Sequence, residues 1–361
     1  MSTHRKPGRD TTIETINEPS AREFLSRVTR VFQTKPFQPH SLFTGGHAQT
    51  FAAYGWPYRF RFKPTADEER LFTVATGVRV LAQCRWQSEA PAHPTLVMWH
   101  GMEGSTASGY MPSTAQKAFR AGFNVIRVNL RNCGGTEHLT PTLYHAGLSE
   151  DLRAVISELI ERDGLQRIFI AGFSLGGNLV LKCAGEYGEN PPPQLLGVCA
   201  ISPSVDPAAS VAAIMRRSNW IYQLDFVRRM RNRIYIKHKL FPELYDVSQI
   251  DRVRTLRDFD ETYTSKVHGF AGADDYYQKS GALNVIDRIR IPTLIVHAED
   301  DPFIPFAPLR HPSVSQNPYV LLVATSRGGH VAFVSQKNDH EDRFWAENRA
   351  VEFFKLANES F

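Results

Sequence analysis

Ser174 is the residue around which the candidate chemistry of this chain is arranged. It lies at the centre of Gly172–Gly176, which reads Gly-Phe-Ser-Leu-Gly. The apolar run that begins at Ile168 predicts a buried strand before this turn, and Asn178–Lys182 predicts the start of a helix after it. A tight turn between a strand and a helix exposes the serine hydroxyl, and glycines allow the chain to turn so sharply. The pattern predicts a nucleophilic serine.

His330 is the expected base. A serine hydroxyl is a weak nucleophile until a base accepts its proton, and that base needs a third group to orient it. A single histidine among thirteen is more often structural, but His330 lies in Ser326–Val331, Ser-Arg-Gly-Gly-His-Val, directly after the predicted strand Tyr319–Thr325. Because a loop at the end of a late strand can bring a histidine to the serine, we expect this one to act as the base.

The third group is expected to be Asp301. The predicted strand Pro292–His297 is followed by Ala298–Pro305, Ala-Glu-Asp-Asp-Pro-Phe-Ile-Pro. This run resembles the acid loop of the α/β-hydrolases, in which the aspartate just before the first proline belongs to the catalytic triad. The resemblance favours Asp301, and Asp300 is the alternative.

Two backbone N–H groups must stabilise the oxyanion that forms when a serine attacks a carbonyl group. The N–H of Leu175 lies at the start of the helix after Ser174 and is one expected donor. His100–Met102 resembles the His-Gly-x pattern of the α/β-hydrolases, which implies that the Met102 N–H is the second donor. His100 is expected to orient its loop.

Further motifs narrow the resemblance to the YheT-like branch of the α/β-hydrolases, which includes bacterial YheT and the eukaryotic ABHD-type lipases and esterases. These motifs are Gly46–Thr50, His100–Ser105, Asn129–Gly135, Gly172–Asn178, Phe259–Thr264, His268–Phe270 and Tyr276–Tyr277. The resemblance spans about residues 40 to 350. It implies a carboxylic-ester hydrolase acting on acyl esters, and some relatives act on glycerolipids or transfer acyl groups to alcohols. Gly46–Thr50 is expected to be irregular and either to pack under the sheet, which we favour, or to border the active site.

The elements that must position these residues follow from the hydrophobic pattern. An antiparallel hairpin is followed by apolar runs that alternate with helical patterns, which predicts an α/β-hydrolase fold with a mostly parallel central sheet flanked by helices. The alternation stops after Pro203 and resumes near Ile291, so the stretch between them is predicted to be a helical cap. The expected organisation is an N-terminal extension (1–40), a first part of the core (41–203), the cap (204–290) and a second part of the core (291–361).

Composition limits the classes of partner. The 361 residues are 42% apolar and 22% charged, as in soluble globular proteins. The four cysteines are widely separated, and no His, Cys or acidic cluster has metal-ligand spacing, so neither a cofactor nor a metal is expected. The start of the chain lacks the apolar run of a signal peptide, and no stretch is apolar enough to span a bilayer, so a cytoplasmic location is expected.

The net charge of +5 includes a basic group of cap residues between Arg216 and Lys239. These residues are interpreted either as a solvated helical face or as a surface for peripheral contact with anionic lipid headgroups. Nucleic-acid binding is not expected, because no nucleic-acid-binding motif accompanies the charge.

The leading functional hypothesis is a serine esterase or lipase-like enzyme whose substrate is a small acyl ester or a lipid. An acyltransferase or thioesterase would use the same acyl-enzyme, and the sequence does not separate these reactions because water exclusion decides between them. A non-catalytic binding module is the third hypothesis. It is disfavoured because all three expected triad members are present, and a serine rather than an aspartate at the turn argues against halide- or epoxide-processing chemistry.

Overall fold

The structure, a computed structural model, describes residues 16–55 and 67–361 of the chain. Eight strands form one sheet in the order β1-β2-β4-β3-β5-β6-β7-β8. They are β1 (Glu68–Ala75), β2 (Val78–Arg85), β3 (Thr95–Trp99), β4 (Asn124–Val128), β5 (Ile168–Phe173), β6 (Leu195–Ile201), β7 (Thr293–Ala298) and β8 (Val320–Thr325). β1 pairs with β2 and β2 with β4 in antiparallel fashion, whereas the remaining pairs are parallel. The mostly parallel sheet of an α/β-hydrolase fold, with its opening hairpin, is confirmed.

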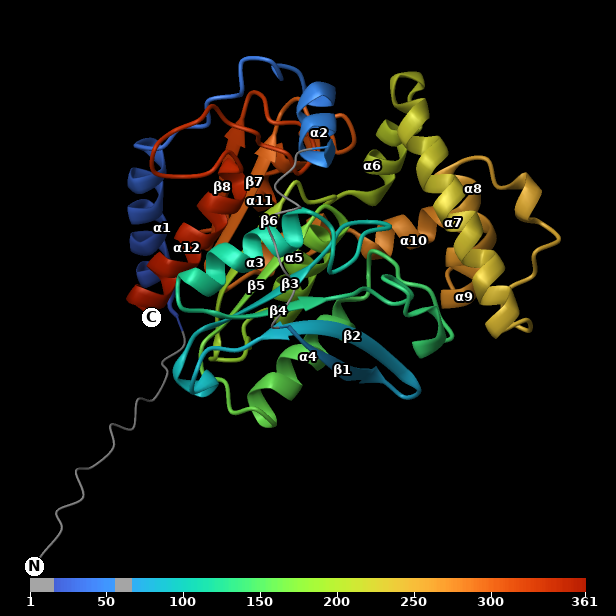
Figure 1. The fold of residues 1–361 in the computed structure, drawn as a ribbon, viewed down its shortest axis with the longest axis horizontal. Helices are drawn as coiled ribbons and strands as arrows, with labels where there is room; N and C mark the ends of the chain where they lie inside the picture. Colours follow the sequence, from blue (N-terminus) through green and yellow to red (C-terminus); the bar gives the residue numbers. More distant parts are fainter. Residues whose placement is uncertain (1–15, 56–66) are drawn as a thin grey trace, which may run out of the picture.

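Burial explains why the central strands are continuous apolar runs in the sequence. Every residue of β3, β5 and β6 is buried, because helices cover both faces of the sheet (Figure 1). β2 alternates between buried and more exposed positions, as expected for a strand near the edge. All four cysteines are buried, and none of them forms a disulfide.

Two helical layers cover the sheet. One layer contains α4 (Ser149–Glu161) and α5 (Leu175–Tyr187). The other contains α1 (Glu18–Gln33), α3 (Tyr110–Arg120) and α12 (Trp345–Ser360), which share a second apolar cluster with the sheet. α1 therefore belongs to the packed fold. The sequence predicts a short amphipathic helix near Ala21–Phe32, which α1 confirms, within an otherwise loose extension. Residues 1–15 of that extension lie outside the described residues.

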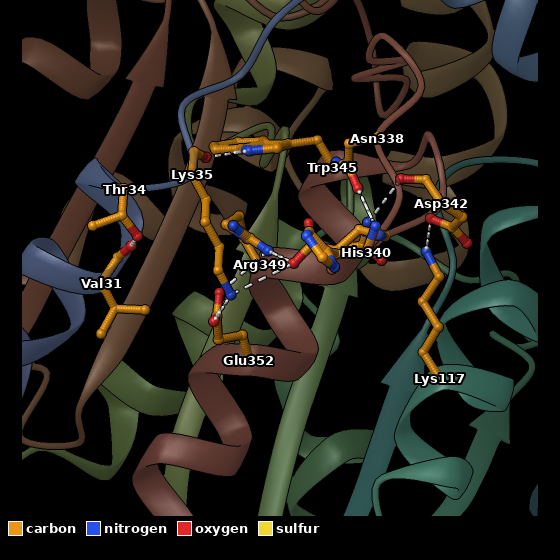
Figure 2. A network of polar contacts seen from close by, with 12 residues as sticks. Val31, Thr34, Lys35, Lys117, Asn338, His340, Asp342, Trp345, Arg349 and Glu352 are labelled. Atoms are coloured by element: carbon orange, nitrogen blue, oxygen red, sulfur yellow. Dashed lines mark hydrogen bonds and ion pairs between the residues drawn. The ribbon is translucent and has the colours of Figure 1, made fainter.

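Polar contacts fasten α1 to the end of the chain (Figure 2). Lys35, which follows α1, forms an ion pair with Glu352 through its ammonium group. The backbone carbonyl of Lys35 accepts a hydrogen bond from Trp345 Nε1 at 2.8 Å. Lys117 of α3 pairs with Asp342 at 2.8 Å, just before α12 begins. Three segments that are far apart in the sequence are thus held on one face of the sheet.

The segment between β6 and β7 is largely helical. It contains α6 (Pro207–Ile214), α7 (Trp220–Leu240), α8 (Leu256–Phe259), a π-helical turn (Asp260–Thr264), α9 (Ser265–His268) and α10 (Ala273–Ser280). Figure 1 shows α7, α8 and α9 to one side of the sheet. We call residues 204–290 the cap. Its apolar side chains form a cluster that also includes Leu143, Phe303 and Ile304 of the core, whereas Tyr276 and Tyr277 of α10 join the main cluster of the core.

One expectation for local structure is wrong, and a second holds only in part. Gly46–Thr50 is not irregular but forms the first half of α2 (Gly46–Gly55), which lies beyond the carboxyl ends of β7 and β8 in Figure 1. The basic residues of the cap do not all belong to a solvated face, because Lys237 is buried and donates to the backbone carbonyl of Glu137 at 3.0 Å. A short helix, α11 (Pro312–Ser315), precedes β8.

Candidate active site

Ser174 lies in a strained turn between β5 and α5. Its φ of 56° and ψ of −116° are unusual for a residue with a side chain. The turn is so tight that a Cβ atom on Gly172 would lie 2.0 Å from the carbonyl oxygen of Gly176, so no other residue fits at that position. The surrounding sheet offsets this strain. The Ser174 N–H donates a hydrogen bond to the Ile201 carbonyl of β6 at 2.9 Å.

The structure brings Ser174, His330 and Asp301 together in one hydrogen-bonded chain. His330 Nε2 lies 3.0 Å from Ser174 Oγ, and His330 Nδ1 lies 2.8 Å from Asp301 Oδ2. The second carboxylate oxygen of Asp301 accepts backbone N–H groups from Phe303 and Ile304 at 2.8 and 3.0 Å. With these bonds the carboxylate fixes the orientation of the imidazole ring, and the ring places its other nitrogen at the serine.

The environment keeps Asp301 ionised. Burial alone would raise the pKa of Asp301, but attraction by His330 and its hydrogen bond, together with His297 and the Ile304 N–H, outweigh burial and leave that pKa below its ordinary value. A charged, fully buried acid next to the imidazole can stabilise the positive charge that forms when His330 accepts a proton.

Asp300, the alternative acid, has a different contact. Its Oδ1 accepts the backbone N–H of Gly329 at 2.9 Å, next to His330 in the sequence. Burial raises the pKa of Asp300. Asp300 therefore holds the histidine loop, while Asp301 holds the histidine ring.

Helix α2 borders the site directly, contrary to the favoured expectation that the Gly46–Thr50 motif packs under the sheet. Thr50 Oγ1 accepts the backbone N–H of His330 at 2.9 Å and donates to the Gly46 carbonyl at 2.7 Å. A Cβ atom on Gly46 would lie 1.9 Å from the carbonyl oxygen of Asp300, so this helix can approach the acid loop only with glycine at that position.

The rest of the motif anchors α2 on both sides. The Gln49 side chain donates to the Val334 carbonyl at 3.0 Å and accepts the Val334 N–H at 2.7 Å, which fixes the helix to the segment after the histidine loop. On the other side, His47 Nδ1 lies 3.2 Å from the Tyr222 hydroxyl of α7. A five-residue motif thus joins the histidine loop to the cap, a role that sequence reasoning missed because its partners are more than 170 positions away.

Ser174 opens into a pocket between the core and the cap. The pocket is lined mainly by apolar side chains. Those from the cap include Val211, Ile214, Met230, Leu256 and Phe259. An apolar pocket with a few polar groups is typical of a small-molecule site.

The two expected oxyanion donors lie at this pocket. Met102 and Leu175 both line it together with Ser174. Within residues 16–55 and 67–361, no backbone hydrogen bond is made by either N–H group, so both can serve a ligand. The loop of Met102 is close to the serine, since a Cβ atom on Gly101 would lie 3.0 Å from the Ser174 Cβ.

His100 orients its loop, as expected. Its Nε2 accepts the Leu130 N–H at 3.1 Å, and its other nitrogen is 2.8 Å from the Gly101 carbonyl. Burial lowers the pKa of His100 to about 4, so the ring stays neutral at physiological pH.

The part of the chain that the structure describes contains no group of three or more His, Cys, Asp or Glu side chains able to hold a metal ion. No described helix has the length and apolar character needed to cross a bilayer.

The chain is similar to known hydrolases in sequence and in fold. A family model described as "alpha/beta hydrolase fold" matches residues 94–336. YheT of Escherichia coli (strain K12) is 29% identical over 315 residues, which cover 87% of this chain and 91% of YheT. Phospholipase ABHD3 of Mus musculus is 28% identical over 247 residues, which cover 68% of this chain but only 60% of that protein. Among solved structures, esterase Pf2001 of Pyrococcus furiosus has a TM-score of 0.54 at 17% identity, over 82% of this chain and 95% of that one, a similarity of fold alone.

Proposed function

Because the chain belongs to the α/β-hydrolase fold family, in its YheT/ABHD-like branch, we propose that it is a serine hydrolase of carboxylic esters. The observation that carries the proposal is the hydrogen-bonded series from Asp301 through His330 to Ser174, which ends at an apolar pocket. The names of the relatives, one of which is a phospholipase, support an ester as the substrate.

The proposed reaction begins with the attack of Ser174 Oγ on the ester carbonyl carbon while His330 Nε2 accepts the hydroxyl proton. Asp301 stabilises the resulting imidazolium ion. The N–H groups of Met102 and Leu175 donate to the oxyanion of the tetrahedral intermediate. His330 then protonates the leaving alcohol, and the acyl group remains on Ser174.

Water completes the cycle. His330 takes a proton from a water molecule that attacks the acyl-enzyme. When the second tetrahedral intermediate collapses, His330 returns this proton to Ser174 Oγ as the carboxylic acid leaves. An alcohol in place of water would give acyl transfer instead. The ratio of acid to new ester in mixtures of water and alcohol measures how the acyl-enzyme divides between these products.

Covalent labelling tests the proposal. A fluorophosphonate probe is expected to label the wild type and not Ser174→Ala, and a series of p-nitrophenyl esters from short to long acyl chains is expected to be hydrolysed by the wild type alone. Equal labelling of Ser174→Ala, or no labelling and no hydrolysis by a folded wild type, would refute the assignment.

We also propose that the start of α7 contacts an anionic lipid surface. Trp220, Ile221 and Leu224 are 60%, 52% and 61% exposed, and the basic residues Arg216 and Arg217 precede them. Exposed apolar side chains beside cationic ones favour the interface of a membrane with anionic headgroups.

This surface is close to the candidate active site. Tyr222 of the same helix packs on Phe303 with 4.5 Å between ring centroids, and Phe303 packs on His330 at 4.8 Å. A lipid surface bound at the start of α7 would therefore lie near the pocket that receives the ester.

A further inference from the structure

Asp260 places an acidic side chain in the wall of the substrate pocket. It begins the π-helical turn Asp260–Thr264 of the cap and lines the same pocket as Ser174, with 8% of its surface exposed. π-helical turns are rare and are frequent at functional sites. The mechanism proposed above makes no use of this residue.

The carboxylate of Asp260 has only neutral partners. Its Oδ1 accepts the hydroxyl of Thr264 and its Oδ2 accepts the hydroxyl of Tyr277, each at 2.8 Å. No Lys, Arg or His of residues 16–55 and 67–361 forms an ion pair with it. A carboxylate has about four acceptor positions, so two remain open toward a donor.

Two other buried acids are each paired with a cation. Glu103, in the same pocket, lies 2.8 Å from Arg233, and Asp151 is paired with Arg131. Burying a carboxylate without a cation is unfavourable, and the cost is removed when a ligand supplies the missing donor. The open positions of Asp260 therefore indicate a ligand contact rather than a purely structural one.

Two tyrosines share the pocket with this carboxylate. Tyr276 and Tyr277 line the pocket, and their ring centroids are 5.1 Å apart. A carboxylate beside aromatic side chains suits a hydroxyl or an ammonium group, and a ring face that meets the ammonium would add a favourable cation–π contact.

We propose that Asp260 determines specificity by accepting a hydrogen bond from a hydroxyl or ammonium group of the substrate, remote from the ester carbonyl. This inference rests on the proposed ester hydrolysis. The preferred substrates are then esters with such a donor in their alcohol part, rather than simple alkyl esters.

Three matched substrates test this proposal: the butyl, 4-hydroxybutyl and 4-ammoniobutyl esters of one fatty acid. The wild type is expected to show a higher kcat/KM for at least one donor-bearing ester than for the butyl ester. Asp260→Asn should lower that preference by on the order of tenfold, mainly through KM, because a hydrogen bond to a charged group is lost. A loss confined to the ammonium ester identifies a cationic group, and a loss for both donors identifies a hydroxyl-binding site.

Glu261→Gln is the matched control, since Glu261 follows Asp260 on the same turn but accepts the Ala273 N–H at 2.8 Å instead of lining the pocket. It should keep the wild-type preference. Fluorophosphonate labelling of every variant shows whether Ser174 still reacts. An unchanged preference in a labelled Asp260→Asn protein, or an equal loss for all three esters, would overturn the inference. If the wild type itself is neither labelled nor active, the proposed function fails, and this inference fails with it.

Discussion

Arg233 of α7 forms an ion pair with Glu103, with 2.8 Å between Nη2 and Oε2, and this pair joins the cap to the loop that carries Met102. Both side chains are almost fully buried. The Tyr144 hydroxyl donates to the other Glu103 oxygen at 2.8 Å and accepts the Glu103 N–H at 3.1 Å. Glu103 has a φ of 56°, so its backbone is held in a conformation that few residues with side chains adopt.

We therefore expect Arg233→Met to impair both stability and turnover. Leaving Glu103 buried without its cation should lower the free energy of unfolding by about 3–5 kcal/mol. Because the N–H of Met102 precedes Glu103, kcat should fall more than KM rises. Urea denaturation and steady-state kinetics measure the two effects. Arg231→Met, which removes a pair with the exposed Asp251, is the control and should change neither. Equal losses of stability and kcat in Arg233→Met and Arg231→Met would contradict the proposed role of the Arg233–Glu103 pair.

Asp301→Asn should reduce kcat by about three to four orders of magnitude, because the amide cannot stabilise the imidazolium and favours the wrong tautomer of His330. Asp300→Asn removes a charge from the neighbouring position and retains an oxygen for the Gly329 N–H, so it should reduce kcat far less. Single-turnover hydrolysis of a p-nitrophenyl ester separates the two variants. A larger loss in the Asp300 variant would assign the acid role to Asp300.

The parts of the site that could be predicted from the sequence are those built from local patterns. Ser174 follows a buried strand and precedes a helix, and Asp301 and His330 follow later strands, so parallel strands bring all three to one edge of the sheet. In the sequence, only the family resemblance distinguishes Asp301 from Asp300, because both follow the same strand. The pairing of Glu103 with Arg233 and the contact of Thr50 with His330 link distant positions, and no local periodicity indicates them. The same holds for α2, whose glycine and polar residues resemble a loop until its tertiary partners are known.

Thr50→Val should lower kcat by about tenfold with little change in KM. The variant leaves the partly buried His330 N–H without an acceptor, at a cost of about 1–3 kcal/mol, and loosens the loop that holds the imidazole. Thr50→Ser keeps the hydroxyl and should restore most of the activity. Kinetics of both variants at one pH, with circular dichroism to verify folding, provide the test. A Ser variant as impaired as the Val variant would show that the methyl packing, rather than the hydrogen bond, matters.

Replacing Trp220 and Leu224 together by Ser should weaken binding to lipid vesicles without affecting hydrolysis of a soluble short-chain ester. Both side chains are exposed, so their loss should change the free energy of unfolding very little. Sedimentation with vesicles that contain 30% phosphatidylserine measures binding, and vesicles of phosphatidylcholine alone test the electrostatic part. The proposed lipid contact is wrong if the wild type sediments with neither kind of vesicle.

The buried carboxyl group of Asp260 should make stability decrease as pH rises through the mildly acidic range. Burial raises the pKa of Asp260 to about 6, against the opposing effect of its two hydroxyl bonds, whereas the unfolded chain ionises near the ordinary value of about 3.9. Between these values the folded state retains a proton that the unfolded state loses. From pH 4 to pH 7 the wild type should therefore lose about 2 kcal/mol more of its free energy of unfolding than Asp260→Asn does. Urea denaturation of both proteins at each pH measures this difference, with Glu261→Gln expected to follow the wild type. Parallel curves for wild type and Asp260→Asn would show that Asp260 titrates alike in both states, and the carboxylate would then not be confined in a dry pocket.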